Sequence, residues 1–264
     1  RNPITSQKQP DMKILFIVPY VPSLIRVRSY NFIRALSAHG HEVSVMTLYT
    51  NEAEREDAVQ LSEMCHAVHA LPLPRWRPIW NSLMAVPTAT PLQVDYCWQP
   101  ELAREINRAL TNGQTELQSF DVIHVEHLRG VRYALYANKL DASNGNPAPP
   151  FIWDSVDCIS LLFREAAEKS QNHMGRAMTR FELKRTEQYE AWITSQLSHI
   201  LITSQRDKDN YLALLPPQES ENKDSMISVV SNGVDLNYFY PGSDDEREPA
   251  SLVVTGKMSY HANI

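Results

Sequence analysis

Short apolar runs alternate with longer segments in which apolar residues recur every three or four positions. The run Lys13 to Val18 is almost continuously apolar, as in a strand buried on both faces of a parallel sheet. A helical pattern follows from Arg26 to Ala38, and Gly40 is placed to end it. The same pattern predicts further strands over 42–48, 67–73, 120–125, 151–153, 199–203 and 226–230, and further helices over 52–64, 79–85, 100–110, 131–138, 173–197 and 205–215.

These repeated strand-helix units predict an α/β fold with a Rossmann-like, open, mostly parallel sheet and helices on both faces. Ligands bind such sheets at the carboxyl ends of the strands. The segment 74–100 contains five prolines, with Trp76 and Trp80 between them, which predicts an excursion from the regular pattern. The stretch Ser204-Gln-Arg-Asp207 is typical of a capping box at a helix start. The longest predicted helix, 173–197, is expected to pack through Met174, Met178, Phe181, Tyr189, Trp192 and Ile193.

A second, shorter unit is expected near the end of the sequence. In V-V-S-N-G-V-D-L-N-Y-F-Y-P, residues 229–241, a strand ends and Asn232-Gly233 is typical of a tight turn with positive φ. An acidic spacer and a new apolar strand, 251–255, follow. We therefore expect residues 1–11 to be a leader or an added segment outside the fold, 12–240 to form the first domain, 241–250 a linker, and 251–264 the first strand of a truncated second domain.

Composition narrows the class of protein. A net charge of −6 and a pI near 5.9 argue against a nucleic-acid partner. Three cysteines without CxxC spacing indicate a reducing, cytoplasmic environment and argue against a zinc knuckle. No apolar run approaches the ~20 residues of a membrane span, and the polar opening is not typical of a signal peptide.

The eight glycines exclude two common nucleotide-binding motifs. No two of them lie closer than Gly233 and Gly242, so neither G-x-G-x-x-G nor G-x-x-x-x-G-K-[ST] occurs. These residues therefore argue strongly against the nucleotide-binding domain of a conventional dinucleotide-binding enzyme and against a P-loop NTPase.

Four blocks in a fixed order carry a family resemblance: M-K-I-L-F-I-V-P…R-A-L-S-A-H-G-H-E-V-S-V-M-T, D-V-I-H-V-E-H-L-R-G, I-L-I-T-S-Q-R-D and V-V-S-N-G-V-D-L-N-Y-F-Y-P-G. Together they resemble the amino-terminal, acceptor-side half of a family 4 retaining glycosyltransferase of GT-B architecture. The resemblance implies two Rossmann-like domains facing a cleft, with a nucleoside diphosphate sugar held mainly by the second domain. It also implies transfer of a hexosyl group with no metal or other cofactor.

The resemblance assigns roles to two adjacent residues after the strand 120–125. Family members often place a histidine at the cleft in this segment, and His127 is the residue that we favour over Glu126. A neutral imidazole can hydrogen-bond a sugar hydroxyl, whereas an imidazolium can favour the departing diphosphate. The alternative is a loop histidine whose nitrogens are satisfied by the backbone.

Charged residues supply the other candidates. The glycine-rich first loop of many family members is replaced here by residues 19–28, so Arg26 or Arg28 can supply charge for phosphate, or can simply be a solvated pair. Asp154 and Asp157 are candidates for binding acceptor hydroxyls, although a helix cap is the commoner role for Asp154. Lys257 follows Gly256 where relatives often place an arginine that contacts the donor diphosphate. His124 and His127, or His66 and His69, have odd spacings on extended backbone, which argues against a metal site.

Arg176, Arg180 and Lys184 recur every four residues on the longest predicted helix, with Arg185 beside them. This basic ridge is typical of a solvated helix face, and contact with anionic lipid at the inner face of a membrane is the alternative.

The function expected from these features is transfer of a sugar from a nucleoside diphosphate sugar to a hydroxyl of a glycan or lipid-linked acceptor, with retention, in cell-surface polysaccharide or related glycan biosynthesis. The 264 residues alone are expected to be inactive, because the main donor-binding domain is not among them. The alternatives are a sugar-nucleotide epimerase of the same architecture and a non-enzymatic Rossmann-like binding module.

Overall fold

The computed structural model describes residues 11–111, 120–144, 149–169, 173–197, 199–236, 238–240, 242 and 250–252. The chain divides into two compact units, Arg1–Asn232 and Gly233–Ile264. Lys257 lies outside the described residues, and so does most of the strand predicted over 251–255.

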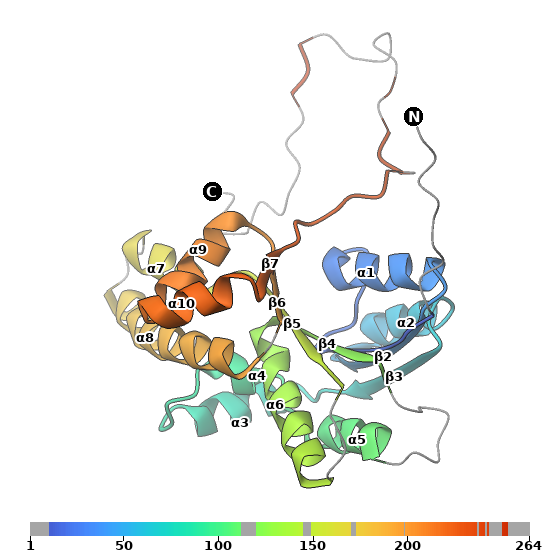
Figure 1. Cartoon of the computed structure of the whole chain (residues 1–264), viewed down its shortest axis with the longest axis horizontal. Helices are drawn as coiled ribbons and strands as arrows, with labels where there is room; N and C mark the ends of the chain where they lie inside the picture. Colours follow the sequence, from blue (N-terminus) through green and yellow to red (C-terminus); the bar gives the residue numbers. More distant parts are fainter. Residues whose placement is uncertain are drawn as a thin grey trace. The chain divides into compact units, whose positions relative to one another are not determined.

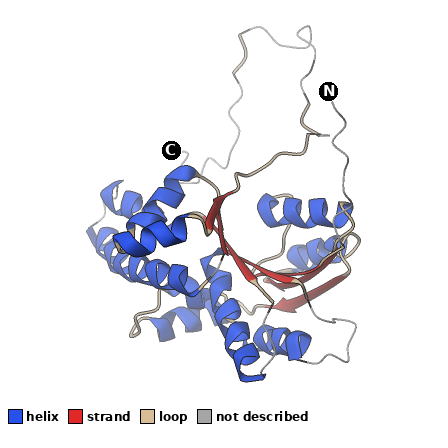
Figure 2. Ribbon diagram, in the orientation of Figure 1, coloured by secondary structure: helices blue, strands red, loops and turns tan. Residues whose placement is uncertain are grey.

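The first unit is a seven-stranded, entirely parallel sheet in the order β3-β2-β1-β4-β5-β6-β7 (Figures 1 and 2). Its strands are β1 Lys13–Val18, β2 Glu42–Tyr49, β3 Ala67–Pro72, β4 Val122–Glu126, β5 Phe151–Val156, β6 His199–Ile202 and β7 Ile227–Val229. The predicted Rossmann-like fold class is confirmed, because each strand predicted before residue 231 is present within two or three residues of its expected bounds.

Ten helices connect these strands within the described residues. They are α1 Val27–Ala38, α2 Glu52–Leu61, α3 Trp76–Ala85, α4 Leu92–Tyr96, α5 Pro100–Thr111, α6 His127–Asn144, α7 Ile159–Lys169, α8 His173–Gln196, α9 Gln205–Ala213 and α10 Pro217–Asp224. The hydrophobic pattern missed α4, α7 and α10. No helix in the described part of the chain is long and apolar enough to cross a bilayer.

Alternate residues of the central strands enter two separate cores, as expected for a sheet covered on both faces. Ile14, Phe16 and Val18 of β1 pack with α1 and α2, whereas Leu15 and Ile17 pack toward the opposite face, where α5 and α6 lie (Figure 1).

The predicted ends of two helices are confirmed. Gly40 has φ +93° just beyond α1, a backbone conformation that residues other than glycine rarely adopt. Ser204 accepts a hydrogen bond from the backbone N–H of Asp207 at the start of α9. The tight turn expected at Asn232-Gly233 is wrong. Gly233 does not have positive φ, and the side chain of Asn232 instead accepts a hydrogen bond from Arg28.

The packing predicted for α8 is confirmed only in part. Ile193 is buried and Tyr189 packs against the core, whereas Met178, Phe181 and Trp192 are each close to half exposed. The buried side of α8 carries several polar residues, among them Glu182, Arg185 and Glu190. Glu190 accepts backbone N–H bonds from Ile159 and Ser160 at the start of α7.

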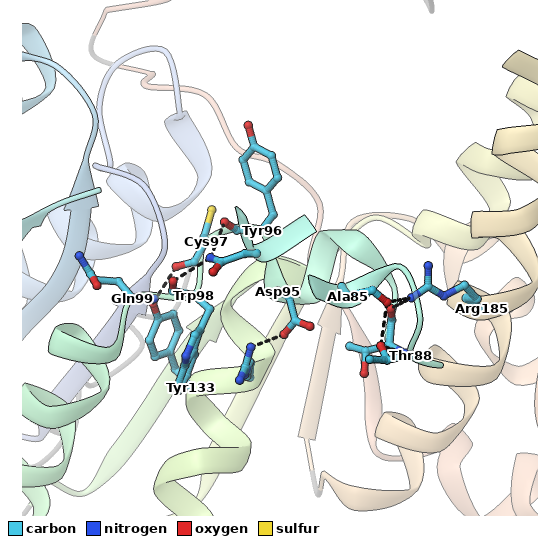
Figure 3. A network of polar contacts seen from close by, with 12 residues as sticks. Ala85, Thr88, Asp95, Tyr96, Cys97, Trp98, Gln99, Tyr133 and Arg185 are labelled. Atoms are coloured by element: carbon cyan, nitrogen blue, oxygen red, sulfur yellow. Dashed lines mark hydrogen bonds and ion pairs between the residues drawn. The ribbon is translucent and has the colours of Figure 1, made fainter. Parts of the chain in front are cut away.

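Arg185 does not belong to the basic ridge. It is buried, forms an ion pair with Glu182 and donates to the backbone oxygens of Ala85 and Thr90, as Figure 3 shows for Ala85. Arg180 and Lys184 are exposed, as predicted for a solvated face.

The excursion predicted over 74–100 is an ordered part of the first unit. Tyr133 of α6 donates to the carbonyl oxygen of Cys97 and accepts from the N–H of Gln99, both at 2.7 Å (Figure 3). Asn81 of α3 donates to the carbonyl oxygen of Trp98 at 2.9 Å. These buried contacts fix α3 and α4 against α6.

Candidate functional site

The strand order reverses between β1 and β4, and this reversal opens a crevice at their carboxyl ends. Tyr20, two residues after β1, donates a hydrogen bond of 2.7 Å to Glu126, the last residue of β4. The contact joins residues 106 positions apart directly across the reversal.

A pocket of about 500 Å³ occupies this position. The carboxyl ends of β1, β2 and β4 and the amino ends of α1 and α6 contribute to it, and α3 and α4 close one side. Its lining is Pro19, Tyr20, Arg26, Val27, Arg28, Leu48, Thr50, Glu54, Leu73, Pro78, Tyr96, Cys97, Glu126, His127 and Arg129. Four of the predicted site residues, Arg26, Arg28, Glu126 and His127, are thereby brought together.

Glu126 is buried, with 3% of its surface exposed. Burial raises the pKa of Glu126 to about 7, although the hydrogen bond from Tyr20 opposes the rise. Burial and the neighbouring Glu126 in turn raise the pKa of Tyr20 far above its ordinary value, so Tyr20 stays a hydrogen-bond donor. A carboxyl group with a pKa near 7 can exchange a proton at neutral pH, as an acid-base group must.

His127 has φ +63° at the junction of β4 and α6. This left-handed conformation is uncommon outside glycine, although histidine adopts it more often than most residues, and such conformations are concentrated at functional sites. The carbonyl oxygen of His127 accepts from the indole of Trp153, and its Nδ1 accepts from the backbone N–H of Arg129, both at 3.3 Å. Burial and the adjacent Arg129 lower the pKa of His127 to about 3. The neutral imidazole is thus the form available to a ligand.

The two predicted arginines are both ion-paired. Arg26 donates to Glu54 at 2.8 Å and lies 5.0 Å from the centre of the Tyr20 ring. Arg28 is buried, and its Nε donates to Asp154 at 2.8 Å. The prediction of a solvated arginine pair is therefore wrong for Arg28.

Arg28 also connects the site to the end of the first unit. Its Nη1 donates to the carbonyl oxygen of Val230 at 2.8 Å and to Oδ1 of Asn232 at 2.9 Å. Its Nη2 is buried without an acceptor among the described residues. Arg28 thus links α1, β5 and the segment after β7.

Asp154 is not a helix cap. It lies inside β5, fully buried, and its carboxylate binds Arg28 while its Oδ1 accepts from the N–H of Val156 at 3.2 Å. Burial raises the pKa of Asp154, and the bond from Arg28 opposes that rise. Asp157 lies outside the pocket lining and accepts from the hydroxyl of Thr203 at 3.4 Å.

Sequence reasoning missed Arg129. Its guanidinium donates to the amide oxygen of Gln93 at 2.7 Å and lies 4.9 Å from the centre of the Tyr96 ring. Neither neighbour carries negative charge, so the positive charge of Arg129 can serve an anionic ligand in the pocket. The block D-V-I-H-V-E-H-L-R-G contained the signal, since Arg129 follows the same strand end as His127.

A second cavity, of about 670 Å³, lies against the opposite halves of the strands, under α1. Ile14, Val122, Ile152 and Leu201 line its sheet side, and its surface is mainly apolar. It lacks the cluster of charged side chains found at the strand reversal. Within the described residues, no three His, Cys, Asp or Glu side chains are grouped to hold a metal ion.

Comparisons with known proteins add little beyond the fold. No family model matches the chain, and no curated protein matches it. Among solved structures, TcCGT1 in complex with UDP is 9% identical, with a TM-score of 0.44 over 94% of this chain and 54% of the other.

Two further solved structures also have low sequence identity and a low TM-score. Phytolacca americana UGT2, complexed with UDP-2fluoro-glucose and pterostilbene, is 11% identical, with a TM-score of 0.48 over 85% of this chain and 55% of the other. A short-chain dehydrogenase/reductase from Serratia marcescens is also 11% identical, with a TM-score of 0.36 over 74% of each chain. The chain spans about half the length of the first two structures. These likenesses do not identify a function.

Proposed function

We propose that this chain forms the acceptor-side part of a glycosyltransferase of GT-B architecture. The proposed reaction moves a hexosyl group from a nucleoside diphosphate sugar to an acceptor hydroxyl with retention, in the cytoplasm, during biosynthesis of polysaccharide or a related glycan. The observation that carries the proposal is the pocket at the β1–β4 reversal, in which Glu126, His127 and Arg129 converge. The ordered sequence blocks that resemble family 4 enzymes support it.

The side chains of the pocket suit different parts of this reaction. Neutral His127 can hydrogen-bond a hydroxyl of the donor sugar without adding charge next to the reacting carbon. Arg129 and Arg26 can offset negative charge that develops on the departing diphosphate. Buried Glu126 can hold the acceptor hydroxyl by accepting its hydrogen bond, and Tyr20 orients the carboxylate.

In a retaining front-face route, the bond from the anomeric carbon to the diphosphate oxygen breaks as the acceptor oxygen bonds to the same face. The acceptor proton then passes to the departing diphosphate oxygen. Charge on that oxygen is what the pocket must stabilise, which is why positive side chains matter more here than a strong base. Lys257, outside the described residues, remains a proposed contact to the diphosphate.

In the protein expressed from its complete gene, we expect His127→Asn to lower turnover about 100-fold or more. The free energy of unfolding should change little. Asparagine tolerates positive φ, so the change removes the imidazole and keeps the backbone conformation. The measurement is transfer of labelled sugar from a panel of nucleoside diphosphate sugars to glycan and lipid-linked acceptors. His69→Asn, on β3 outside the pocket lining, is the matched control.

Three outcomes of that assay would contradict the proposal. Unchanged turnover in His127→Asn would remove this pocket from the reaction. Conversion of the donor with the acceptor omitted would indicate an epimerase. Full turnover by a preparation shown by mass to end at Ile264 would contradict the expectation that these residues need a second domain.

A further inference from the structure

The outward face of α3 is apolar. Its side chains recur at the three- and four-residue spacing of a single helix face and are between 53% and 72% exposed: Trp76, Ile79, Trp80, Leu83 and Met84. The opposite side buries Pro78, Asn81 and Ala85. This arrangement reverses the usual amphipathic pattern of a surface helix, in which the polar face meets water. Contiguous exposed apolar surface of this kind marks an interaction site.

The orientation of α3 is fixed by buried polar contacts. Asn81 donates to the backbone oxygens of Tyr96 and Trp98, at 3.3 and 2.9 Å. At the other end, Nη2 of Arg185 donates to the carbonyl oxygen of Ala85 at 2.6 Å (Figure 3). Rotation of α3 to bury its apolar face would break all three bonds.

The neighbouring surface of α8 combines apolar and basic side chains. Met178 and Phe181 are 50% and 46% exposed. Lys184 is exposed three residues after Phe181, next to it on the helix surface, and exposed Arg180 lies one turn before Lys184. The guanidinium of Arg185, which binds Ala85, lies 4.9 Å from the centre of the Phe181 ring. Phe181 therefore lies beside the end of α3, and the two helices form one surface.

Positive charge borders this surface although the whole chain carries −6. Arg75 is exposed immediately before α3, and the guanidinium of Arg77 lies 4.6 Å from the centre of the Trp76 ring. Arg180 and Lys184 lie on the α8 side. Apolar and aromatic side chains bordered by cations match the boundary between acyl chains and anionic headgroups.

We propose that α3, together with Met178 and Phe181 of α8, docks this protein on the surface of a bilayer that contains anionic phospholipid. The five apolar side chains of α3 enter the headgroup region, and Arg75, Arg180 and Lys184 contact lipid phosphates. The helix lies flat in the interface because its apolar stripe runs along its length.

Docking in this way would present the candidate site to the membrane surface. Pro78, on the inner side of α3, lines the pocket that contains Glu126 and His127. One helix diameter, about 10 Å, thus separates the bilayer from that pocket. A lipid-linked acceptor is the substrate class that this placement favours, a point that rests on the proposed function.

The test is flotation of the whole chain with vesicles of phosphatidylcholine alone or of equal parts phosphatidylcholine and phosphatidylglycerol. We expect binding to the anionic vesicles that weakens as salt rises. Ile79→Glu/Leu83→Glu is expected to lower the bound fraction about tenfold, since both carboxylates would have to enter the interface. Arg180→Glu/Lys184→Glu is expected to lower binding to anionic vesicles selectively.

The matched controls lie on exposed helix positions elsewhere. Val59→Glu on α2, at a site 60% exposed, and Arg104→Glu on α5 should leave binding unchanged. Thermal unfolding of every variant checks that the fold is retained, which these outward positions allow. Quenching of Trp76 and Trp80 fluorescence by brominated lipid, lost in Trp76→Phe/Trp80→Phe, places α3 at the bilayer.

Other results would overturn the inference. The chain could fail to float with either kind of vesicle, or Val59→Glu could lose as much binding as the α3 variant. A dimer that depends on α3 and does not float would instead make this face an interface between two copies of the chain. The assay needs no sugar nucleotide, so its failure would leave the proposed reaction standing, and failure of the reaction would leave the docking result standing.

Discussion

Replacing Arg28 by methionine is expected to lower the free energy of unfolding by about 3–5 kcal/mol, because the change leaves Asp154 as an unpaired carboxylate inside β5. Asp154 has no exposed surface, so water cannot take the place of the guanidinium. The bonds from Arg28 to Val230 and Asn232 are lost at the same time. Urea denaturation followed by circular dichroism measures the effect.

The matched control is Arg55→Met, which breaks an exposed pair with Glu52 and should change the free energy of unfolding little. The double variant Arg28→Met/Asp154→Leu separates the two causes. If the cost comes mainly from an uncompensated buried charge, removal of both partners should recover most of the lost stability. A double variant no more stable than Arg28→Met would assign the cost to the lost bonds at Val230 and Asn232.

Replacing Glu126 by glutamine is expected to change how stability depends on pH, by about 2–3 kcal/mol between pH 5 and pH 8. The pKa of Glu126 is raised from 4.5 to about 7 in the folded chain, so between these values the folded state holds a proton that the unfolded state has lost. Stability from this group is therefore greatest at low pH and falls as pH rises toward 7. Glutamine removes that fall and can still accept the hydrogen bond from Tyr20.

Thermal and urea unfolding of both proteins at several pH values test this directly. The difference between the two free energies should grow in favour of the variant from pH 5 upward and level off above pH 7. Glu42→Gln, at a half-exposed position, is the matched control for the loss of one carboxylate. Parallel curves for Glu126→Gln would show that Glu126 does not titrate near neutrality.

The strands were predictable because those at the centre of the sheet are buried on both faces. Leu15 and Ile17 meet one core and Ile14 and Phe16 the other, so the sequence is apolar without interruption. The buried face of α8 was not predictable in this way, because Glu190 occupies a core position and is satisfied by backbone N–H groups of α7. Hydrophobicity does not reveal such pairing.

The candidate site was predictable only in part. Glu126 and His127 were found because they directly follow a strand, where α/β proteins collect ligand-binding groups. Tyr20 was missed because its role depends on a contact with Glu126 across 106 residues. The partnership of Arg28 with Asp154 spans 126 residues and has no local signature, so a helix cap was the better reading of Asp154 from sequence.

The strand order has a consequence for synthesis of the chain. During translation, β1, β2 and β3 are complete once residue 72 has emerged, but the neighbour on the other side of β1 is β4, which begins at Val122. Until about fifty further residues are made, β1 has one unpaired edge, and such edges pair readily with other nascent chains. Arg28 must wait longer still, for Asp154 and then Asn232, before it can leave water. The centre of the sheet is therefore completed only late in synthesis of this unit. We expect nascent chains stalled before Val122 to bind chaperones more than longer nascent chains do.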